Sequence, residues 1–355
     1  MKKLIIKTSF FIIPFLLLFI ISQSFYKNDK GDLLRLGYIY DSNNYDFKVE
    51  YKKYFDRESY YKKVSEINLD TINSFDFVSI GDSFSSQGPI GYQNCLVYKT
   101  KIKLLDIDRD LYDSPIQGLY DLINGGFFNK NKTKYVILQN VERGFVERGK
   151  SISKTDKFTI DSLKENFIKK NKQKSEKEPE KKSKDQFFSK DNIRFFMYNF
   201  NYLYDDNANV SPTYKVNTTK RLFSVQEHKL LFFEDDTKIL KSNNDKLLIE
   251  NLNNELNILS DKLASLNIKL IVLPSPDKYD IYYNYIVNKE KYEKPIFFDH
   301  FNTLKKRYIY INSKNILTKA ITTQKDVYFY DDTHWSPIAS ELIASEISHI
   351  CKLIK

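Results

Sequence analysis

Apolar and polar residues alternate in blocks along most of the chain, and the blocks predict strands separated by helices. Residues 75–80 form a short β-favouring run that ends in Gly81-Asp82-Ser83, which is typical of a strand followed by a sharp turn. Further strands are predicted at residues 101–107 and 135–138, with a helix around residues 117–123 between them. Such alternation predicts a parallel sheet in an α/β domain.

The second half of the chain continues this arrangement. A helix is predicted after residues 243–245, because leucines recur at spacings of three and four and form one apolar stripe: Leu252, Leu256, Leu259, Leu263 and Leu266. A nearly continuous apolar strand follows at residues 268–273. The last unit is a strand at residues 327–330, a short loop, and a closing helix from Pro337 to about residue 354, since proline suits a first helical turn.

Two regions fall outside this pattern. Residues 27–70 are polar and rich in Tyr, Lys and Asp, and we interpret them as a spacer before a domain that covers residues 71–355. Periodicity lapses again between about residues 150 and 190, where residues 169–184 are almost entirely polar or charged. This stretch cannot bury enough apolar surface to order itself, so we expect a solvated, disordered insertion. A basic patch for an anionic polymer is the alternative, although three glutamates interrupt it.

The N-terminus carries a targeting pattern. Lys2, Lys3 and Lys7 precede an apolar run at residues 10–21, after which the chain becomes polar. This order is typical of an export signal whose basic end stays in the cytoplasm, so the domain is expected outside, in the periplasm or the extracellular space. We favour an uncleaved signal anchor over residues 1–26; cleavage near Ser22-Gln23-Ser24 is the alternative and would give a secreted protein.

The composition of the chain excludes few classes of binding partner. With 41% hydrophobic and 15% aromatic residues among 355, the chain is a folded protein rather than a disordered one. The formal charge of +10 suits several anionic partners, but no basic-plus-aromatic pattern indicates nucleic acid. Cys95 and Cys351 form no CxxC pair, so a disulfide and two separate thiols both remain open. The four histidines show no ligand spacing, and neither a metal nor a cofactor is predicted.

Ser83 is the candidate nucleophile. A serine hydroxyl needs a base to take its proton and donors for the developing oxyanion, and it must stand clear of the sheet. The turn after the first predicted strand meets this need, because Gly81 permits a tight turn and backbone amides follow the strand end. The alternative is an ordinary turn with no chemical role.

His334 is the candidate base. It is the one histidine of four that follows an acidic residue at a spacing of two, so Asp332 is placed to accept the Nδ1 proton while Nε2 faces the serine. Asp331 is the alternative orienting acid, and an ordinary helix cap is the alternative for the whole motif. In a doubly wound sheet both turns lie at the carboxyl ends of strands, where such folds build their sites.

These motifs resemble a known family. Gly81-Asp82-Ser83-Phe84 is similar to the nucleophile block of SGNH (GDSL-type) hydrolases, and residues 332–337 are similar to the Asp-Thr-His-Trp block of the alginate O-acetyltransferase (AlgX/AlgJ-like) branch. Val141-Glu142-Arg143 and residues 271–275, followed by Lys278 and Tyr279, also resemble that branch. The resemblance spans about residues 75–345.

The resemblance has departures. In the alginate proteins the Asp-His block precedes the serine, whereas here Ser83 comes first, as in ordinary SGNH hydrolases. A Gly-x-Asn-Asp block is also missing. The oxyanion and substrate side is therefore left with six candidates, for several of which a loop or strand-end role is the alternative: Asp82, Phe84, Gly118, Gln139, Asn140 and Arg143.

The resemblance implies a three-layer, doubly wound, mainly parallel sheet of the SGNH or flavodoxin-like type. It implies an extracytoplasmic enzyme that moves acetyl groups to sugar hydroxyls of an exported polysaccharide through an acyl-serine, with a membrane-bound O-acyltransferase as acetyl donor. Trp335, Lys278 and Tyr279 would then lie on the substrate side. Two alternatives stay open: a carbohydrate acetyl esterase with the same triad, and a catalytically silent polysaccharide-binding or assembly protein.

Overall fold

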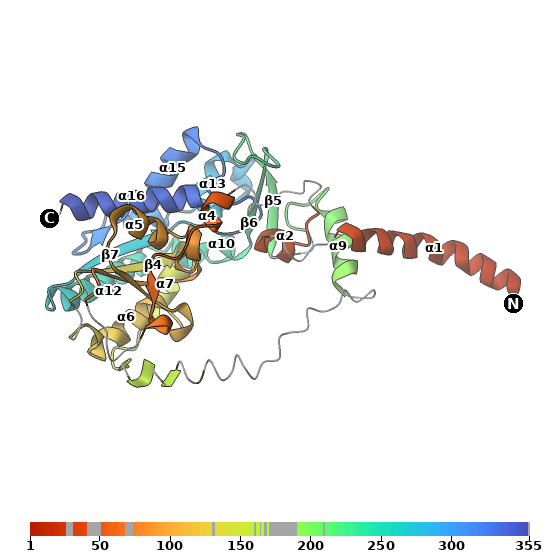
Figure 1. The fold of residues 1–355 in the computed structure, drawn as a ribbon. Coiled ribbons are helices and arrows are strands. Elements are labelled where there is room, and N and C mark those ends of the chain that lie inside the picture. Colours follow the sequence, from red (N-terminus) through yellow and green to blue (C-terminus); the bar gives the residue numbers. More distant parts are fainter. Residues whose placement is uncertain are drawn as a thin grey trace.

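The central element of the fold is a six-stranded parallel sheet (Figure 1). A computed structural model describes residues 1–25, 31–40, 51–67, 74–129, 132–159, 161–163, 165–166, 169, 190–208 and 210–353. Across the sheet the strands lie in the order β1 (Lys62–Lys63), β3 (Leu104–Ile107), β2 (Phe77–Ile80), β4 (Tyr135–Val141), β7 (Lys269–Ser275) and β8 (Ile309–Tyr310). Every neighbouring pair is parallel, which confirms the predicted α/β class.

Both faces of this sheet are covered, which explains the nearly continuous apolar strands. In β2 the side chain of Phe77 packs into one core, whereas Val78 and Ile80 pack into the other. One face is covered by α5 (Tyr92–Thr100), α15 (Ser313–Thr323) and α16 (Pro337–Leu353). The other is covered by α6 (Pro115–Asn124), α7 (Glu142–Lys150), α12 (Lys246–Ala264) and α14 (Phe297–Phe301). The result is a three-layer, doubly wound domain.

The strand order reverses at β2. The chain passes from β2 to β3 on one side, and then crosses to β4 on the other side of β2. In open α/β sheets the crevice at such a reversal, beyond the carboxyl ends of the strands, is the usual binding position. Gly81-Asp82-Ser83 follows β2 directly and therefore lies at this position.

Smaller elements extend the domain. A second, antiparallel sheet pairs β5 (Thr213–Asn217) with β6 (Lys229–Phe233). The remaining helices are α2 (Asp32–Leu36), α4 (Lys52–Phe55), α9 (Lys190–Asn201), α10 (Asp235–Lys238), α11 (Leu240–Asn243) and α13 (Lys278–Tyr282). Short 3₁₀ helices are η1 (Val64–Glu66), η3 (Ser83–Ser85), η4 (Gly88–Ile90), η5 (Arg109–Leu111), η6 (Phe127–Asn129), η7 (Tyr283–Tyr285) and η8 (Lys289–Lys291). This small sheet was not predicted from the sequence pattern.

Residues 327–330 do not form the predicted sheet strand. Tyr328 makes a single antiparallel bridge with Trp335, and Ser336 N donates to Val327 O. The apolar run is real and buried, but the chain turns back at once, so the run pairs with its own continuation instead of the sheet. His334 therefore lies on a closed loop over residues 328–335 rather than after a sheet strand.

The predicted spacer contributes to the domain. Residues 31–40 and 51–67 include α2, α4 and edge strand β1, and Leu33 and Leu34 are buried. Their apolar residues are too sparse to form a periodic pattern, which is why the sequence suggested a spacer. The rest of the predicted spacer, and the charged stretch at residues 170–184, lie outside the described residues.

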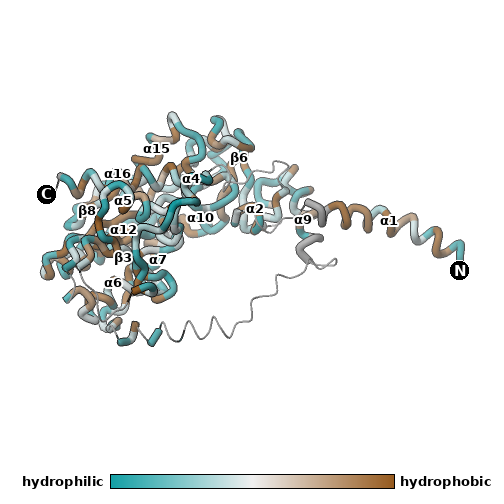
Figure 2. The backbone as a smooth tube through the Cα atoms, in the orientation of Figure 1, coloured by the Kyte–Doolittle hydropathy of each residue, from teal (hydrophilic) through white to brown (hydrophobic). Residues whose placement is uncertain are grey.

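The N-terminal helix α1 (Lys2–Phe25) projects away from the domain (Figure 1) and is apolar along most of its length (Figure 2). Its Lys2–Ile21 stretch is long and apolar enough to cross a membrane, and none of it is buried. Such a helix suits a signal anchor or a signal sequence. Cys95 in α5 and Cys351 in α16 are free thiols, so the open question of a disulfide is answered against a bond.

Candidate active site

The turn after β2 is built around a glycine. A Cβ at Gly81 would lie 2.1 Å from Ser85 Oγ and 2.6 Å from Gln139 Oε1, so no other residue fits there without displacing the turn. Asp82 then caps η3, because its Oδ1 accepts a hydrogen bond of 3.2 Å from Phe84 N. Ser83 is the first residue of η3 and remains partly exposed.

Hydrogen bonds of the Asp82 and Gln139 side chains hold this turn in place. The other carboxylate oxygen of Asp82 accepts from Val141 N at 2.7 Å and from Arg148 Nη1 at 2.8 Å. Gln139 Oε1 accepts from Asp82 N at 3.0 Å and Ser85 Oγ at 2.9 Å. Both side chains are buried, so their contacts fix the backbone around Ser83.

His334 and Asp332 form the expected pair. His334 Nδ1 lies 2.6 Å from Asp332 Oδ1, and His334 N donates to the same oxygen at 2.9 Å. Within the described part of the chain, His334 Nε2 is buried and has no hydrogen-bond partner. With the proton on Nδ1 donated to the carboxylate, Nε2 carries a lone pair, as a general base requires.

The electrostatics favour an imidazolium beside a carboxylate. Burial opposes protonation of His334, but the hydrogen bond and charge of Asp332 outweigh burial and raise the pKa of His334. Burial likewise would raise the pKa of Asp332, yet the hydrogen bonds and charge of His334 hold that pKa below its ordinary value. Asp332 therefore stays ionised and stabilises the proton that His334 takes up.

Ser83 and His334 meet in one cavity. Its volume is about 360 Å³, and its lining consists of Phe55, Ser83, Ser86, Gln87, Ile90, Arg109, Phe329, Asp332 and His334. Two contacts join the serine turn to the histidine loop: Gln87 Nε2 donates to Trp335 O at 2.9 Å, and the Phe84 ring lies 4.8 Å from the imidazole. No hydrogen bond joins Ser83 Oγ to His334 Nε2 among the described residues; such bonds often tighten only when substrate binds.

Asp32 is a site residue that sequence reasoning missed. Its two carboxylate oxygens accept from Thr333 N at 2.8 Å and from Thr333 Oγ1 at 2.7 Å. Burial, followed by the charge of Asp332, raises the pKa of Asp32. No pattern in the sequence marked it, because a lone acid lies here in a polar stretch some 300 residues from its partner.

Asp331, the alternative orienting acid, faces away from the imidazole. Its Oδ2 accepts from Gly31 N at 3.0 Å, and burial raises its pKa to about 6. Leu33 N also donates to Asp331 O at 3.0 Å. Asp331 therefore connects the histidine loop to the N-terminal segment, while Asp332 holds the imidazole.

Lys278, Tyr279 and Trp335, expected on the substrate side, all lie in the interior. Lys278 Nζ donates to the carbonyls of Phe329, Tyr330 and Asp332 at 2.6, 2.6 and 3.1 Å, and burial lowers its pKa to about 7. Tyr279 OH donates to Glu293 O at 2.5 Å. The Trp335 ring packs against Phe84 at 5.0 Å. Lys278 and Trp335 thus shape the histidine loop, and none of the three is available to stack on a sugar in this conformation.

The other oxyanion and substrate candidates are also held by the protein. Phe84 is fully buried. Gly118 lies within α6, where a Cβ would come 2.8 Å from the Tyr112 ring, so close packing explains the glycine. Asn140 Oδ1 accepts from Arg148 Nη1 at 2.5 Å. Arg143 pairs with Asp236 at 3.1 Å and Asp277 at 2.8 Å. Asn140 Nδ2, in contrast, has no hydrogen-bond partner among the described residues, so this amide remains a candidate oxyanion donor.

Arg109 was not singled out from the sequence. It lines the cavity from η5, just beyond the carboxyl end of β3, and is exposed. A strand-end position next to β2 is the signal that could have identified it. Its guanidinium is the one permanently charged cation among the residues that line this cavity.

Asp32, Asp332 and His334 also have the spacing of a metal site, since one ligand atom of each lies within 4.8 Å of the others. The atoms of these side chains that could bind a metal are already engaged in hydrogen bonds, however. Both Asp32 oxygens accept from Thr333, and the closest Asp332 oxygen accepts from the imidazole. The hydrogen-bonded pair accounts for this cluster without an ion.

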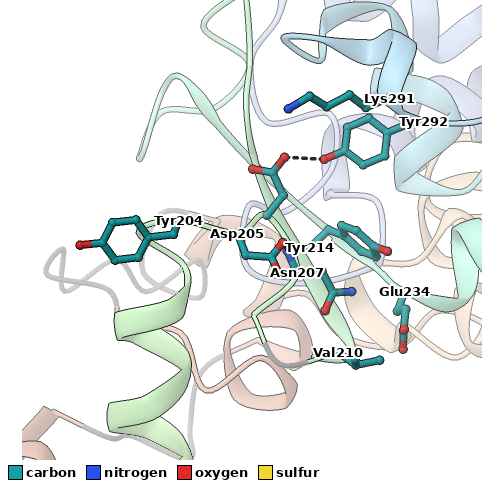
Figure 3. Close-up of a pocket in the computed structure, with 9 residues that line it drawn as sticks. Tyr204, Asp205, Asn207, Val210, Tyr214, Glu234, Lys291 and Tyr292 are labelled. Carbon is teal, nitrogen blue, oxygen red and sulfur yellow. Dashed lines mark hydrogen bonds between the residues drawn. The ribbon is translucent and has the colours of Figure 1, made fainter.

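A larger hollow of about 510 Å³ lies at the end of α9 (Figure 3). Tyrosines and acids line it, and Tyr292 OH donates to Asp206 Oδ2 at 2.6 Å. It contains no nucleophile with an adjacent base, so the chemistry belongs to the smaller cavity.

Comparison with known proteins gives one match. Residues 228–353 match the family model described as the SGNH hydrolase-like domain of acetyltransferase AlgX. The matched region contains Asp332 and His334, whereas Ser83 lies before it. Neither the curated proteins nor the solved structures gave a match. The match covers less than half of the chain; together with the doubly wound parallel sheet, it makes the C-terminal part similar to this SGNH hydrolase-like domain and suggests acyl-transfer or hydrolase chemistry.

Proposed function

We propose that this protein is an extracytoplasmic O-acetyltransferase that acts on sugar hydroxyls of a cell-envelope or exported polysaccharide through an acyl-Ser83 intermediate. One observation carries the proposal: Ser83 and the Asp332–His334 pair line a single cavity at the carboxyl edge of the sheet. The fold alone would not support it, because many functions share one fold.

In the first half-reaction, His334 Nε2 takes the Ser83 hydroxyl proton while Oγ attacks the acetyl carbonyl carbon of the donor ester. The tetrahedral intermediate collapses, the donor C–O bond breaks, and the imidazolium returns its proton to the leaving oxygen. Asp332 stabilises the imidazolium throughout, in keeping with the raised pKa of His334.

In the second half-reaction, His334 deprotonates a sugar hydroxyl, whose oxygen attacks the acetyl-serine ester. The Ser83 Oγ–acyl bond breaks, and Oγ recovers the proton from His334. The products are an acetylated sugar and the free serine. Water in place of the sugar would give the esterase reaction with the same residues, so acceptor access decides between the two.

The acetyl donor is proposed to be a membrane-bound O-acyltransferase. Helix α1 supports this, since it is long and apolar enough to hold the domain at a membrane. The family match supports the polysaccharide acceptor.

The experiment is a chromogenic acetyl ester assay with and without an oligosaccharide acceptor. We expect the acceptor to accelerate release and to gain an acetyl group, and Ser83→Ala to lose the activity. Ser86→Ala is the matched control, because Ser86 lines the same cavity one turn further along. Release that ignores the acceptor would support the esterase and contradict the transferase. Equal, non-zero activity in Ser83→Ala and the wild type would contradict Ser83 as the nucleophile, and a wild type without activity would leave the silent assembly protein.

A further inference from the structure

Helix α9 presents an apolar surface that the protein itself does not cover. After residue 25, eleven large apolar side chains of the described residues are exposed, and six of them lie between residues 196 and 210: Phe196, Met197, Phe200, Leu203, Tyr204 and Val210. Their exposed fractions run from 48% to 81%. Scattered exposed apolar residues are normal, whereas a cluster of this kind marks an interaction surface.

The cluster begins on one stripe of amphipathic α9 and continues into the turn after the helix ends at Asn201. Phe196, Met197 and Phe200, followed by Leu203 and Tyr204, recur at helical spacings of one, three and four. The opposite stripe is packed on the domain. Phe195 is buried against Tyr40, with ring centroids 6.4 Å apart, and Tyr198 packs on Tyr38 at 5.6 Å. One face of α9 thus packs on the domain, and the large apolar side chains of the other face are exposed.

The position of α9 indicates what covers this stripe. Helix α1 contacts α9, and in Figure 1 α9 lies across the domain-side end of α1 rather than alongside it. If α1 spans a bilayer, its domain-side end marks the outer membrane–water interface. A helix that crosses this end lies in the plane of that interface. Aromatic and other large apolar side chains are the residues that favour this depth.

We propose that the exposed stripe of α9 and of the turn that follows it, defined as Phe196, Met197, Phe200, Leu203 and Tyr204, inserts into the headgroup–acyl boundary of the membrane that α1 spans. The inference rests on the retention of α1 and goes beyond the proposed chemistry. The following chain is acidic at Asp205 and Asp206, so binding depends on apolar contact and needs no anionic lipid.

This contact fixes the active site relative to the membrane. Asn199 Nδ2 donates to Tyr38 O at 2.7 Å, and Tyr40 N donates to Asn199 Oδ1 at 2.8 Å. These bonds tie α9 to the segment that carries α2, and Asp32 of α2 binds Thr333 beside His334. An inserted α9 therefore holds the histidine loop at a set orientation to the bilayer, as a donor within that bilayer would require.

The test uses the single tryptophan of the chain as an internal reference. Trp335 is fully buried, so lipid quenchers do not reach it. Full-length Phe200→Trp is reconstituted in phosphatidylcholine vesicles with bromine near either the glycerol backbone or the acyl-chain ends. We expect clear quenching of the added tryptophan, stronger with bromine near the glycerol backbone, and no change on addition of phosphatidylglycerol.

Leu247→Trp is the matched control. Leu247 is 64% exposed and lies on α12, far from α1 in Figure 1, so we expect no quenching there. Equal, negligible quenching of the Phe200→Trp and Leu247→Trp proteins would overturn the proposal. An unquenched Phe200→Trp whose emission shifts with protein density would overturn it in favour of a second copy. Ester hydrolysis by the same samples is read separately, so failure of the proposed chemistry and failure of membrane insertion are distinguishable.

Discussion

The imidazole of His334 is held by residues from three distant parts of the chain. Asp332 binds Nδ1, Asp32 supports the intervening Thr333, and Lys278 draws together three carbonyls of the loop. Together these contacts restrict the conformations open to a loop that carries no regular secondary structure. The orientation of Nε2 is therefore a property of this network rather than of His334 alone.

Substitutions of the two neighbouring acids, Asp332 and Asp331, should reduce activity to very different extents. Asp332→Asn removes the carboxylate that orients and stabilises the imidazolium, so we expect kcat/KM for ester hydrolysis to fall roughly 10³- to 10⁴-fold. Asp331→Asn keeps an acceptor for Gly31 N and should cost less than about tenfold. Equal losses in the two variants would show that the carboxylate roles are assigned wrongly.

Asp32 should contribute to the pH dependence after Asp332. Its charge helps to raise the pKa of His334, and His334 acts as a base only when neutral, so activity rises with pH through that pKa. Asp32→Asn should lower the pKa of His334 and thereby move the acidic limb of the kcat/KM profile to lower pH. Thr333→Ser is the control: it alters packing but keeps the hydroxyl that donates to Asp32, so it should leave the limb in place. If the acidic limb of the kcat/KM profile does not move in Asp32→Asn, the role of Asp32 is structural only.

Among the elements, the turn between β2 and η3 is the most constrained. Gly81→Ala places a methyl group against Ser85 and Gln139, both of which are buried, so we expect a loss of about 1–3 kcal/mol in unfolding free energy and of most activity. Gly88→Ala is the comparison, because open space surrounds Gly88 and only its positive φ of 59° opposes alanine. It should cost about 1 kcal/mol and retain activity, as denaturant titration and the ester assay would show. Similar activity losses in Gly81→Ala and Gly88→Ala would contradict the claim that close packing at Gly81 positions Ser83.

The sequence predicted elements where periodicity was long and failed where it was short. The leucine stripe of α12 and the apolar run of β7 are correct because helices and buried strands leave repeated signals. Residues 327–330 show the same β-favouring signal as β2 but bridge to Trp335 instead, since four residues do not determine their pairing partner. Asp32 left no signal, because its partner is specified only by the tertiary fold. The pairing of Asp332 with His334 was predictable since two residues separate them.

The whole molecule brings its N-terminal segment to the active site. Six residues separate Phe25 at the end of α1 from Asp32, and the seven Cα–Cα steps between them span at most about 25 Å when fully extended. The histidine loop is therefore held close to the domain-side end of the membrane-length helix, as acyl transfer from a membrane donor would need.

Truncation tests this arrangement. A chain that begins at residue 26 keeps α2 and should hydrolyse a soluble acetyl ester like the full-length protein. A chain that begins at residue 37 loses Asp32 and buried Leu33, and we expect kcat to fall by about 10²-fold through a misplaced histidine loop. Equal activity in the two chains would mean that the N-terminal segment is dispensable for catalysis.

The central claim is that Ser83 carries the acyl group. The most direct measurement is mass spectrometry of the full-length protein quenched in acid during turnover of an activated acetyl ester. We predict one acetyl group, located on the peptide that contains Ser83, abolished in Ser83→Ala and discharged by an oligosaccharide acceptor. Turnover in the wild type without acetyl on Ser83, or unchanged labelling in Ser83→Ala, would contradict the account.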